Sequence, residues 1–157
     1  MVLMDYTIRI KDVSPQQLVL ARRKCSWAEW GAAVEGLLRD VWARLNQLES
    51  VTVGPAMARI HELDGTMLEV EAGFPVAEPL TATEGVEIGE LAAGRAVTTL
   101  HTGPYERLSE AAAALDDCVA REGLRVAAAP WFIFWVDPDQ VDSPVDLRTE
   151  LVLPIVE

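Results

Sequence analysis

The sequence is poor in the residues that build metal centres and disulfides, and it has no long apolar run. Its 157 residues include two cysteines and two histidines, far apart and without the close spacing of metal ligands. We therefore expect Cys25 and Cys118 to be reduced thiols, with no metal and no cofactor. No apolar run approaches the roughly 20 residues that span a bilayer, and the first residues do not resemble a signal peptide. These features predict a cytoplasmic protein that does not contact membranes.

Basic residues are also scarce. Lysine and arginine number 13 against 25 acidic residues, so the formal charge is −12. A surface that binds nucleic acid needs a basic stripe, and the only basic cluster is Arg22-Arg23-Lys24. We expect no direct binding to nucleic acid, and a surface that attracts cations. Half of the residues are apolar, which is enough to bury the core of a single domain, 1–157.

The same order of predicted elements occurs twice. Hydrophobic periodicity predicts strands near 6–10 and 17–23, a helix over about 26–47, and strands near 56–61 and 66–71. Ser26 and Glu29 have the spacing of a capping box at the start of this helix. A second set, with a helix over about 106–121 and a final strand that begins at Arg148, follows residue 85.

This order divides the chain into repeat 1 (about 1–78), a connector (about 79–84) and repeat 2 (about 85–157). Glu71 and Glu150 hold equivalent positions near the ends of the two repeats. We predict an α+β fold made of two strand–strand–helix–strand–strand units. They would share one antiparallel sheet, with both helices on one face and a ligand cleft at the pseudo-twofold axis.

A single carboxylate, that of Glu150, interrupts the apolar run of the last predicted strand. Burying a charge is unfavourable by several kcal/mol unless an opposite charge or a set of hydrogen bonds compensates for it. Glu150 therefore has a partner in the chain, for which Arg148 and Arg59 are the candidates, or accepts one from a ligand.

Several short motifs, taken in order, resemble the GyrI-like small-molecule-binding domain. This domain binds effectors at the C-terminus of many AraC-type and some MerR-type regulators, and also occurs alone. The motifs are His101-Thr102-Gly103-Pro104-Tyr105, Pro130-Trp131, Asp137-Pro138, Arg148-Thr149-Glu150 with Pro154, and Glu71-Ala72-Gly73-Phe74-Pro75-Val76. The resemblance implies a tandem SHS2-like fold that binds drugs and dyes, often aromatic cations, between aromatic walls and beside a buried glutamate.

By motif position, the expected charge anchor is Glu150, and Glu71 is its counterpart or an exposed residue at a strand end. Aromatic faces attract cations by about 0.5–2 kcal/mol each. The candidate walls are Trp131, Phe134, Trp27, Trp30 and Tyr105. The helical spacing of Trp27 and Trp30 also fits core residues, and Tyr105 also fits a packing role at the start of the second helix.

Alternation along residues 131–136 places Trp131 and Trp135 on one face of the strand and Phe134 on the other. From the family position, we expect Phe134 to share the open face with Glu150. Because Trp131 stands at the end of this strand, its side chain is expected to reach either face.

The sequence predicts a stand-alone domain that binds hydrophobic, cationic or aromatic small molecules, as in multidrug or effector binding. One alternative is a hydrolase of cyclopropane-containing or other strained molecules that uses Glu150 and Glu71. Where the family often has tyrosine, this chain has Phe134 and Ile60, and the missing hydroxyls disfavour that chemistry. The other alternative is a protein-binding inhibitor, like the gyrase inhibitor after which the family is named. Because the domain begins near residue 1, we expect no DNA-binding motif ahead of it.

Overall fold

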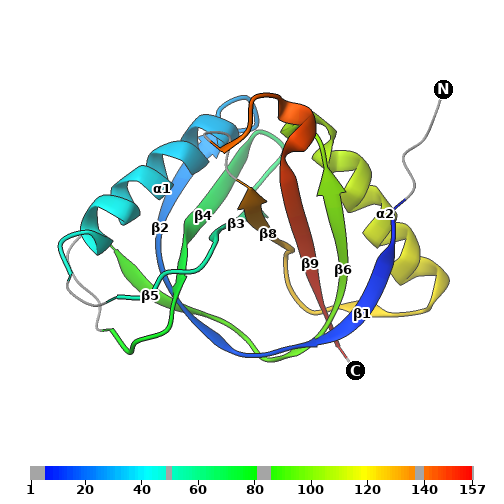
Figure 1. The fold of residues 1–157 in the computed structure, drawn as a ribbon. Helices are drawn as coiled ribbons and strands as arrows, with labels where there is room; N and C mark the ends of the chain where they lie inside the picture. Colours follow the sequence, from blue (N-terminus) through cyan, green and yellow to red (C-terminus); the bar gives the residue numbers. More distant parts are fainter. Residues whose placement is uncertain (1–5, 49–50, 81–85, 137–139, 157) are drawn as a thin grey trace. The chain divides into compact units, whose positions relative to one another are not determined.

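The computed structural model describes residues 6–48, 51–80, 86–136 and 140–156 (Figure 1). They belong to two compact units, one within Ser14–Ala93 and the other within Met1–Val13 and Gly94–Glu157. We call them the α1 unit and the α2 unit after their helices. Each combines antiparallel strands with one α-helix, so the predicted α+β class is confirmed. The predicted turn at Asp137-Pro138 and most of the connector lie outside the described residues.

The α1 unit is a four-stranded antiparallel array with one helix. Its strands are ordered β5-β2-β4-β3, and α1 packs on β2 and β4. Valine and leucine side chains from the strands and from one stripe of the helix form its core. The elements are β2 (Gln16–Ser26), α1 (Trp30–Leu45), β3 (Ala56–Glu62), β4 (Met67–Val76) and β5 (Glu87–Leu91).

The α2 unit repeats this plan with the strand order β1-β6-β9-β8. The short strand β7 pairs with the end of β9, and α2 packs mainly on β6. The elements are β1 (Ile8–Val13), β6 (Gly94–Thr102), η1 (Tyr105–Arg107), α2 (Leu108–Arg121), β7 (Arg125–Val126), β8 (Trp131–Val136), η3 (Pro144–Asp146) and β9 (Arg148–Val156).

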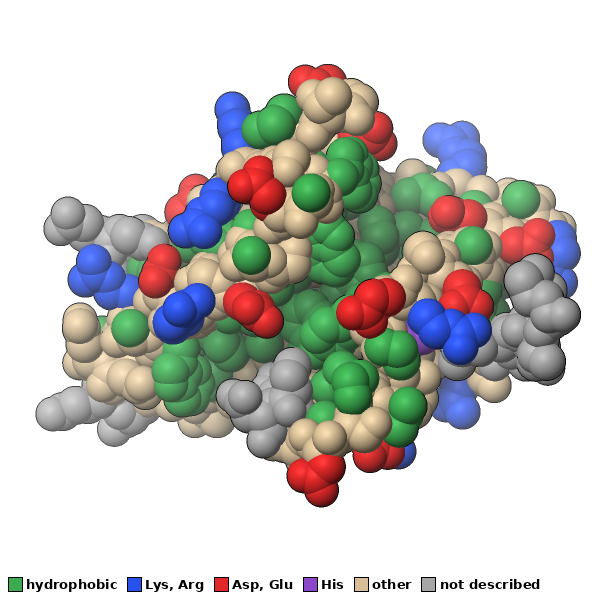
Figure 2. Space-filling view, turned by 90° about the horizontal axis from the view of Figure 1, so that it is seen from above, with side chains coloured by type: hydrophobic (Ala, Val, Ile, Leu, Met, Phe, Trp, Pro, Cys, Tyr) green, Lys and Arg blue, Asp and Glu red, His purple; other side chains and the backbone are tan. Residues whose placement is uncertain are grey.

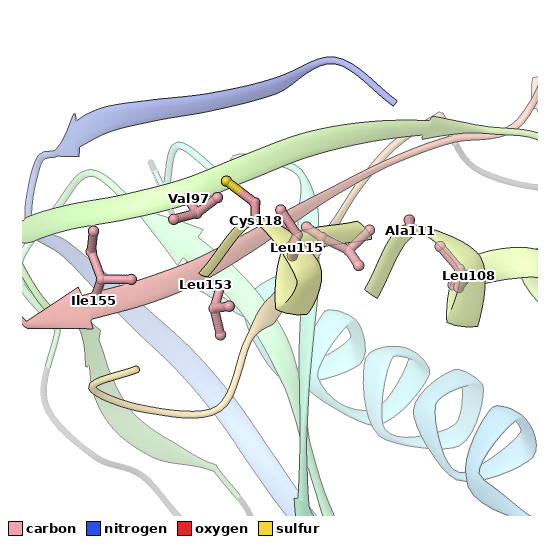
Figure 3. Close-up of a cluster of buried hydrophobic side chains, with 8 residues drawn as sticks. Val97, Leu108, Ala111, Leu115, Cys118, Leu153 and Ile155 are labelled. Atoms are coloured by element: carbon pink, nitrogen blue, oxygen red, sulfur yellow. The ribbon is translucent and has the colours of Figure 1, made fainter. Parts of the chain in front are cut away.

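The core of the α2 unit defines the two faces of its sheet. Figure 3 shows side chains of α2 packed against β6 and β9: Leu108, Ala111, Leu115 and Cys118 face Val97, Leu153 and Ile155. Because side chains alternate along a strand, residues between the inward-facing ones must point to the other face. Glu150 precedes the buried Leu151, so its carboxylate points away from α2.

The strand registers confirm the equivalence of the two glutamates. Arg22 of β2 pairs with Glu71 of β4, and Leu100 of β6 pairs with Glu150 of β9. The same offsets relate the neighbouring strands β1 and β5, which pair with β6 and β2. Strand β1 belongs to repeat 1 but pairs within the α2 unit, and β5 belongs to repeat 2 but pairs within the α1 unit. The repeats and the compact units therefore differ by an exchange of their first strands.

The first helix begins later than the capping box predicts. Ser26 is still part of β2 and pairs with Met67, and α1 starts at Trp30 with Glu29 as its N-cap residue. The hydroxyl of Ser26 donates a hydrogen bond to the Glu29 carboxylate over 2.7 Å. The strand pairing with β4 extends to Ser26, so a turn is needed before the helix can begin.

The described residues also bear on membrane and metal binding. Among them, neither α-helix is long and apolar enough to cross a membrane. Within the same ranges, no three His, Cys, Asp or Glu side chains gather where they could hold a metal ion. Cys25 and Cys118 are buried and free.

Figure 2 shows acidic and basic side chains interspersed over one face of the molecule.

Candidate functional site

An open depression of about 650 Å³ lies on the helix-free face of the α2 unit. Three threonines contribute to its lining together with Arg9, Lys11, Leu100, Trp135, Arg148 and Glu150. These residues come from β1 and the residue before it, β6, β8 and β9. The depression therefore spans all four strands of this sheet.

The register explains why residues distant in sequence meet there. Directly paired residues of antiparallel strands have side chains on the same face. Glu150 pairs with Leu100 on β6 and with Ile133 on β8, whereas Arg9 pairs with Thr98 two residues before Leu100. All of these side chains therefore point away from α2, and the Glu150 carboxylate stands on the helix-free face.

Both carboxylate oxygens of Glu150 have partners. The ammonium of Lys11 lies 2.8 Å from Oε2, and the indole N–H of Trp135 donates to Oε1 over 3.1 Å. The Glu150 side chain is 14% exposed and that of Lys11 is 49% exposed. Lys11 was not among the expected chain partners, Arg148 and Arg59, and Arg59 pairs with Glu71 in the α1 unit. Because β1 joins this unit beside β6, the Lys11 side chain reaches over β6 to Glu150.

The prediction that Phe134 lies beside Glu150 is wrong. Phe134 pairs with Thr149, one residue before Glu150, so it faces the opposite side of the sheet. There it is buried, and its ring meets the edge of Tyr105 at a centroid distance of 5.6 Å. Trp135 stands beside Glu150 instead and is 53% exposed. The alternation along β8 had separated these two side chains correctly, but the wrong face was expected to be open.

The other predicted aromatic residues lie elsewhere. Trp131 is buried and is not among the described residues that line the depression. Tyr105 packs against the core under α2. Trp27 is exposed in the turn before α1, and Trp30 is the half-buried first residue of that helix. Both belong to the α1 unit, and their roles as ligand walls stay predictions.

The His101–Tyr105 motif forms a structural corner at the end of β6. His101 is fully buried, and its Nε2 lies 3.0 Å from the carbonyl of Pro104. Since a carbonyl can only accept, Nε2 carries the proton, and Nδ1 accepts a 2.9 Å hydrogen bond from the hydroxyl of Tyr6. Burial raises the pKa of Tyr6, which keeps this hydroxyl protonated. Gly103 has a φ of +131°, a conformation that favours glycine.

In the α1 unit, the equivalent carboxylate of Glu71 is enclosed by donors. It is 2% exposed, which excludes the alternative of an exposed strand-end residue. His61 Nε2 lies 2.6 Å from Oε1, Arg22 Nη1 lies 3.4 Å from the same oxygen, and Arg59 Nη2 lies 3.3 Å from Oε2. Such a set of partners is what a buried charge requires.

Arg22 links this carboxylate to the surface. Its Nε donates to Glu87 over 2.8 Å, and its Nη1 lies 3.6 Å from Glu69. The hydrogen bond with Glu87 raises the pKa of Arg22, and the nearby charge of Glu71 contributes further. The charged residues on this face therefore neutralise one another, and the sequence pattern had not indicated this network.

Solved structures similar to this chain share its fold. The C-terminal domain of EcmrR is 16% identical, with a TM-score of 0.85 over 98% of this chain and 99% of that one. The EcmrR chain in a complex with DNA is 16% identical, with a TM-score of 0.86 over 97% of this chain. This chain spans 58% of the length of that EcmrR chain.

A third structure, that of SAV2435 bound to tetraphenylphosphonium, is 13% identical, with a TM-score of 0.64 over 98% of this chain and 94% of that one. At these identities the likeness concerns the fold. No curated protein has a significantly similar sequence. Residues 6–156 match the family described as the GyrI-like small molecule binding domain. The match covers nearly the whole chain, which therefore belongs to the GyrI-like small molecule binding domain family.

Proposed function

We propose that the protein binds hydrophobic aromatic cations in the depression of the α2 unit, with Glu150 as the charge anchor. The observation that carries this proposal is the pairing of Glu150 with Lys11. A largely buried carboxylate is held beside an exposed indole, and its charge partner is a half-exposed ammonium. Lys11 thus occupies the place that a cationic group of a ligand would take.

Exchange of Lys11 for a ligand is energetically feasible. An ion pair with a solvent-exposed member contributes about 0–1 kcal/mol, so releasing Lys11 costs little. The ligand then gains the carboxylate, and the indole face of Trp135 adds about 0.5–2 kcal/mol of cation–π attraction. Rings laid over Trp135 and Leu100, both exposed, also remove apolar surface from water.

A structural relative supports this ligand class. SAV2435 has been solved with tetraphenylphosphonium, a cation surrounded by four aromatic rings. A hydrolase would instead need a carboxylate with access to water. The oxygens of Glu71 are occupied by His61, Arg22 and Arg59, so the contacts favour binding over hydrolysis.

The proposal is tested by titrating the protein with tetraphenylphosphonium and following tryptophan fluorescence at constant salt. We expect saturable binding by the wild type and at least about tenfold weaker binding by Glu150→Gln. The matched control is Glu122→Gln, which removes an exposed carboxylate at the end of α2 and should bind like the wild type. Identical titrations of the wild type and Glu150→Gln would refute the proposed anchor.

A further inference from the structure

The depression in the α2 unit is lined by more positive than negative charge. Arg9, Lys11 and Arg148 are its basic residues, and Glu150 is the acidic residue among the described lining. This local excess runs against the charge of the whole chain, which is −12. The excess therefore does not follow from the composition of the chain.

Within the described ranges, the basic residues of the lining outnumber the acidic groups that could balance them. Glu150 is already engaged by Lys11 and Trp135. Among the described residues, no carboxylate forms an ion pair with Arg9 or Arg148. Arg9 and Arg148 are both exposed, so their guanidinium groups keep the capacity to bind an anion.

In the α1 unit, the residues at the equivalent positions carry charges that are paired within the protein. By strand register, the counterpart of Arg9 is Glu87 and the counterpart of Arg148 is Glu69. Both acids lie within 3.6 Å of Arg22. The α2 unit thus has arginines where the α1 unit has acids, and it has Leu100 in place of Arg22.

We infer that the ligand of this site carries an acidic group as well as a cationic one, so that it is an aromatic zwitterion with a carboxylate. The inference rests on the proposed function above. The cationic group pairs with Glu150 and releases Lys11, and the carboxylate pairs with Arg9 and Arg148. The planar guanidinium matches a carboxylate with two parallel hydrogen bonds.

Electrostatics favours this ligand class over a simple cation. A ligand with only positive charge is attracted by Glu150 but repelled by the arginines and by the displaced Lys11. A zwitterion places a negative charge among these basic groups and adds no net positive charge to the depression. Charge of both signs on the ligand therefore matches charge of both signs on the lining.

The test compares rhodamine B, which carries a carboxylate, with its ethyl ester, which has the same rings and cation but no acid. Binding is followed by fluorescence anisotropy at low salt. We expect the wild type to bind rhodamine B about tenfold more tightly than the ester. In the double variant Arg9→Gln/Arg148→Gln, rhodamine B should lose its advantage and bind about as weakly as the ester. The ester should bind this variant at least as tightly as it binds the wild type.

Two controls address charge and geometry. Arg121→Gln/Arg125→Gln removes two exposed arginines of the same unit outside the depression and should keep the preference for rhodamine B. The conservative variant Arg9→Lys/Arg148→Lys keeps both charges and should retain part of the preference for rhodamine B.

The outcomes separate the two proposals. Equal binding of both dyes by the wild type, or a preference that persists in Arg9→Gln/Arg148→Gln, overturns the zwitterion inference alone. Binding of neither dye overturns the proposed function together with it. Melting temperatures close to that of the wild type establish that the variants are folded.

Discussion

The helix-free faces of the two units have the same backbone plan and opposite chemistry. Each presents a glutamate at the same register position, Glu71 in one and Glu150 in the other. Each also places a ring N–H at Oε1, from His61 at 2.6 Å and from Trp135 at 3.1 Å. Arg22 stands beside the first carboxylate and Leu100 beside the second.

The difference teaches that duplication conserves positions while single side chains decide what a position does. Arginines on two neighbouring strands turn the surroundings of Glu71 into a closed ion network. Ile133 and Leu100 occupy the equivalent places beside Glu150 and leave an open depression. We therefore regard the first carboxylate as structural and the second as available to a ligand.

The largest expected effect separates the two glutamates by stability. Glu71→Gln removes the buried negative charge that pairs with Arg22 and Arg59, so we expect a loss of about 3 kcal/mol in the free energy of unfolding. Glu150→Gln should cost less than about 1 kcal/mol, because its ion-pair partner is half-exposed. Urea unfolding measures both values, and equal losses would remove the distinction between the two sites.

The next variant makes the helix-free face of the α2 unit more like that of the α1 unit. Leu100→Arg places a guanidinium beside Glu150, as Arg22 lies beside Glu71. We expect the affinity for tetraphenylphosphonium to fall by about tenfold or more, because the new charge competes with the ligand for the carboxylate. Leu100→Gln is the neutral control and should lose only the apolar contact. If both variants bind equally, charge competition is not what keeps the α1 face closed.

A smaller effect is expected from Lys11→Met. Removing the ammonium frees Glu150 and lowers the positive charge of the depression, so tetraphenylphosphonium should bind about two- to fivefold more tightly. Lys24→Met removes the other lysine of the chain, which is exposed on β2, and should leave binding unchanged. Weaker binding by Lys11→Met would show that Lys11 supports the ligand rather than competing with it.

The smallest effect concerns acid stability, to which the α1 unit contributes more. Hydrogen bonds lower the pKa of Glu29, Asp64 and Glu78 in this unit, whereas in the α2 unit the hydrogen bond with Arg107 lowers the pKa of Glu110. A carboxyl group whose pKa is lower in the folded than in the unfolded state stabilises the folded protein at pH values above its unfolded pKa. This stabilisation is lost as the pH falls through the folded pKa. The affected window lies below about pH 4.5.

The variant that checks this is Glu78→Gln, whose carboxylate accepts hydrogen bonds from the backbone N–H of Thr52 at 3.0 and 2.8 Å. Its melting temperature should fall less than that of the wild type between pH 7 and pH 3. The control is Glu90→Gln on an exposed position of β5, which should follow the wild type. Parallel pH profiles for all three proteins would exclude a contribution from Glu78.

Much of the architecture could be predicted because its signals are local. Periodicity along each segment indicated the strands and both helices, and the repeated order indicated the duplication. A lone carboxylate in an apolar strand singled out Glu150 before its surroundings were known. The family followed from short motifs such as His101–Tyr105, and that motif has a physical basis in the buried hydrogen bonds of His101.

Only the tertiary structure decided which groups surround the two glutamates. Alternation along β8 divided its aromatic side chains between two faces, but the position of α2 determined that Trp135, and not Phe134, stands beside Glu150. Lys11 reached Glu150 because β1 joins the strands of the other repeat. Periodicity is a property of neighbouring residues, whereas strand order and ion pairing depend on contacts between distant ones. For this reason the amino-acid order was sufficient to single out Glu150 but not its partners.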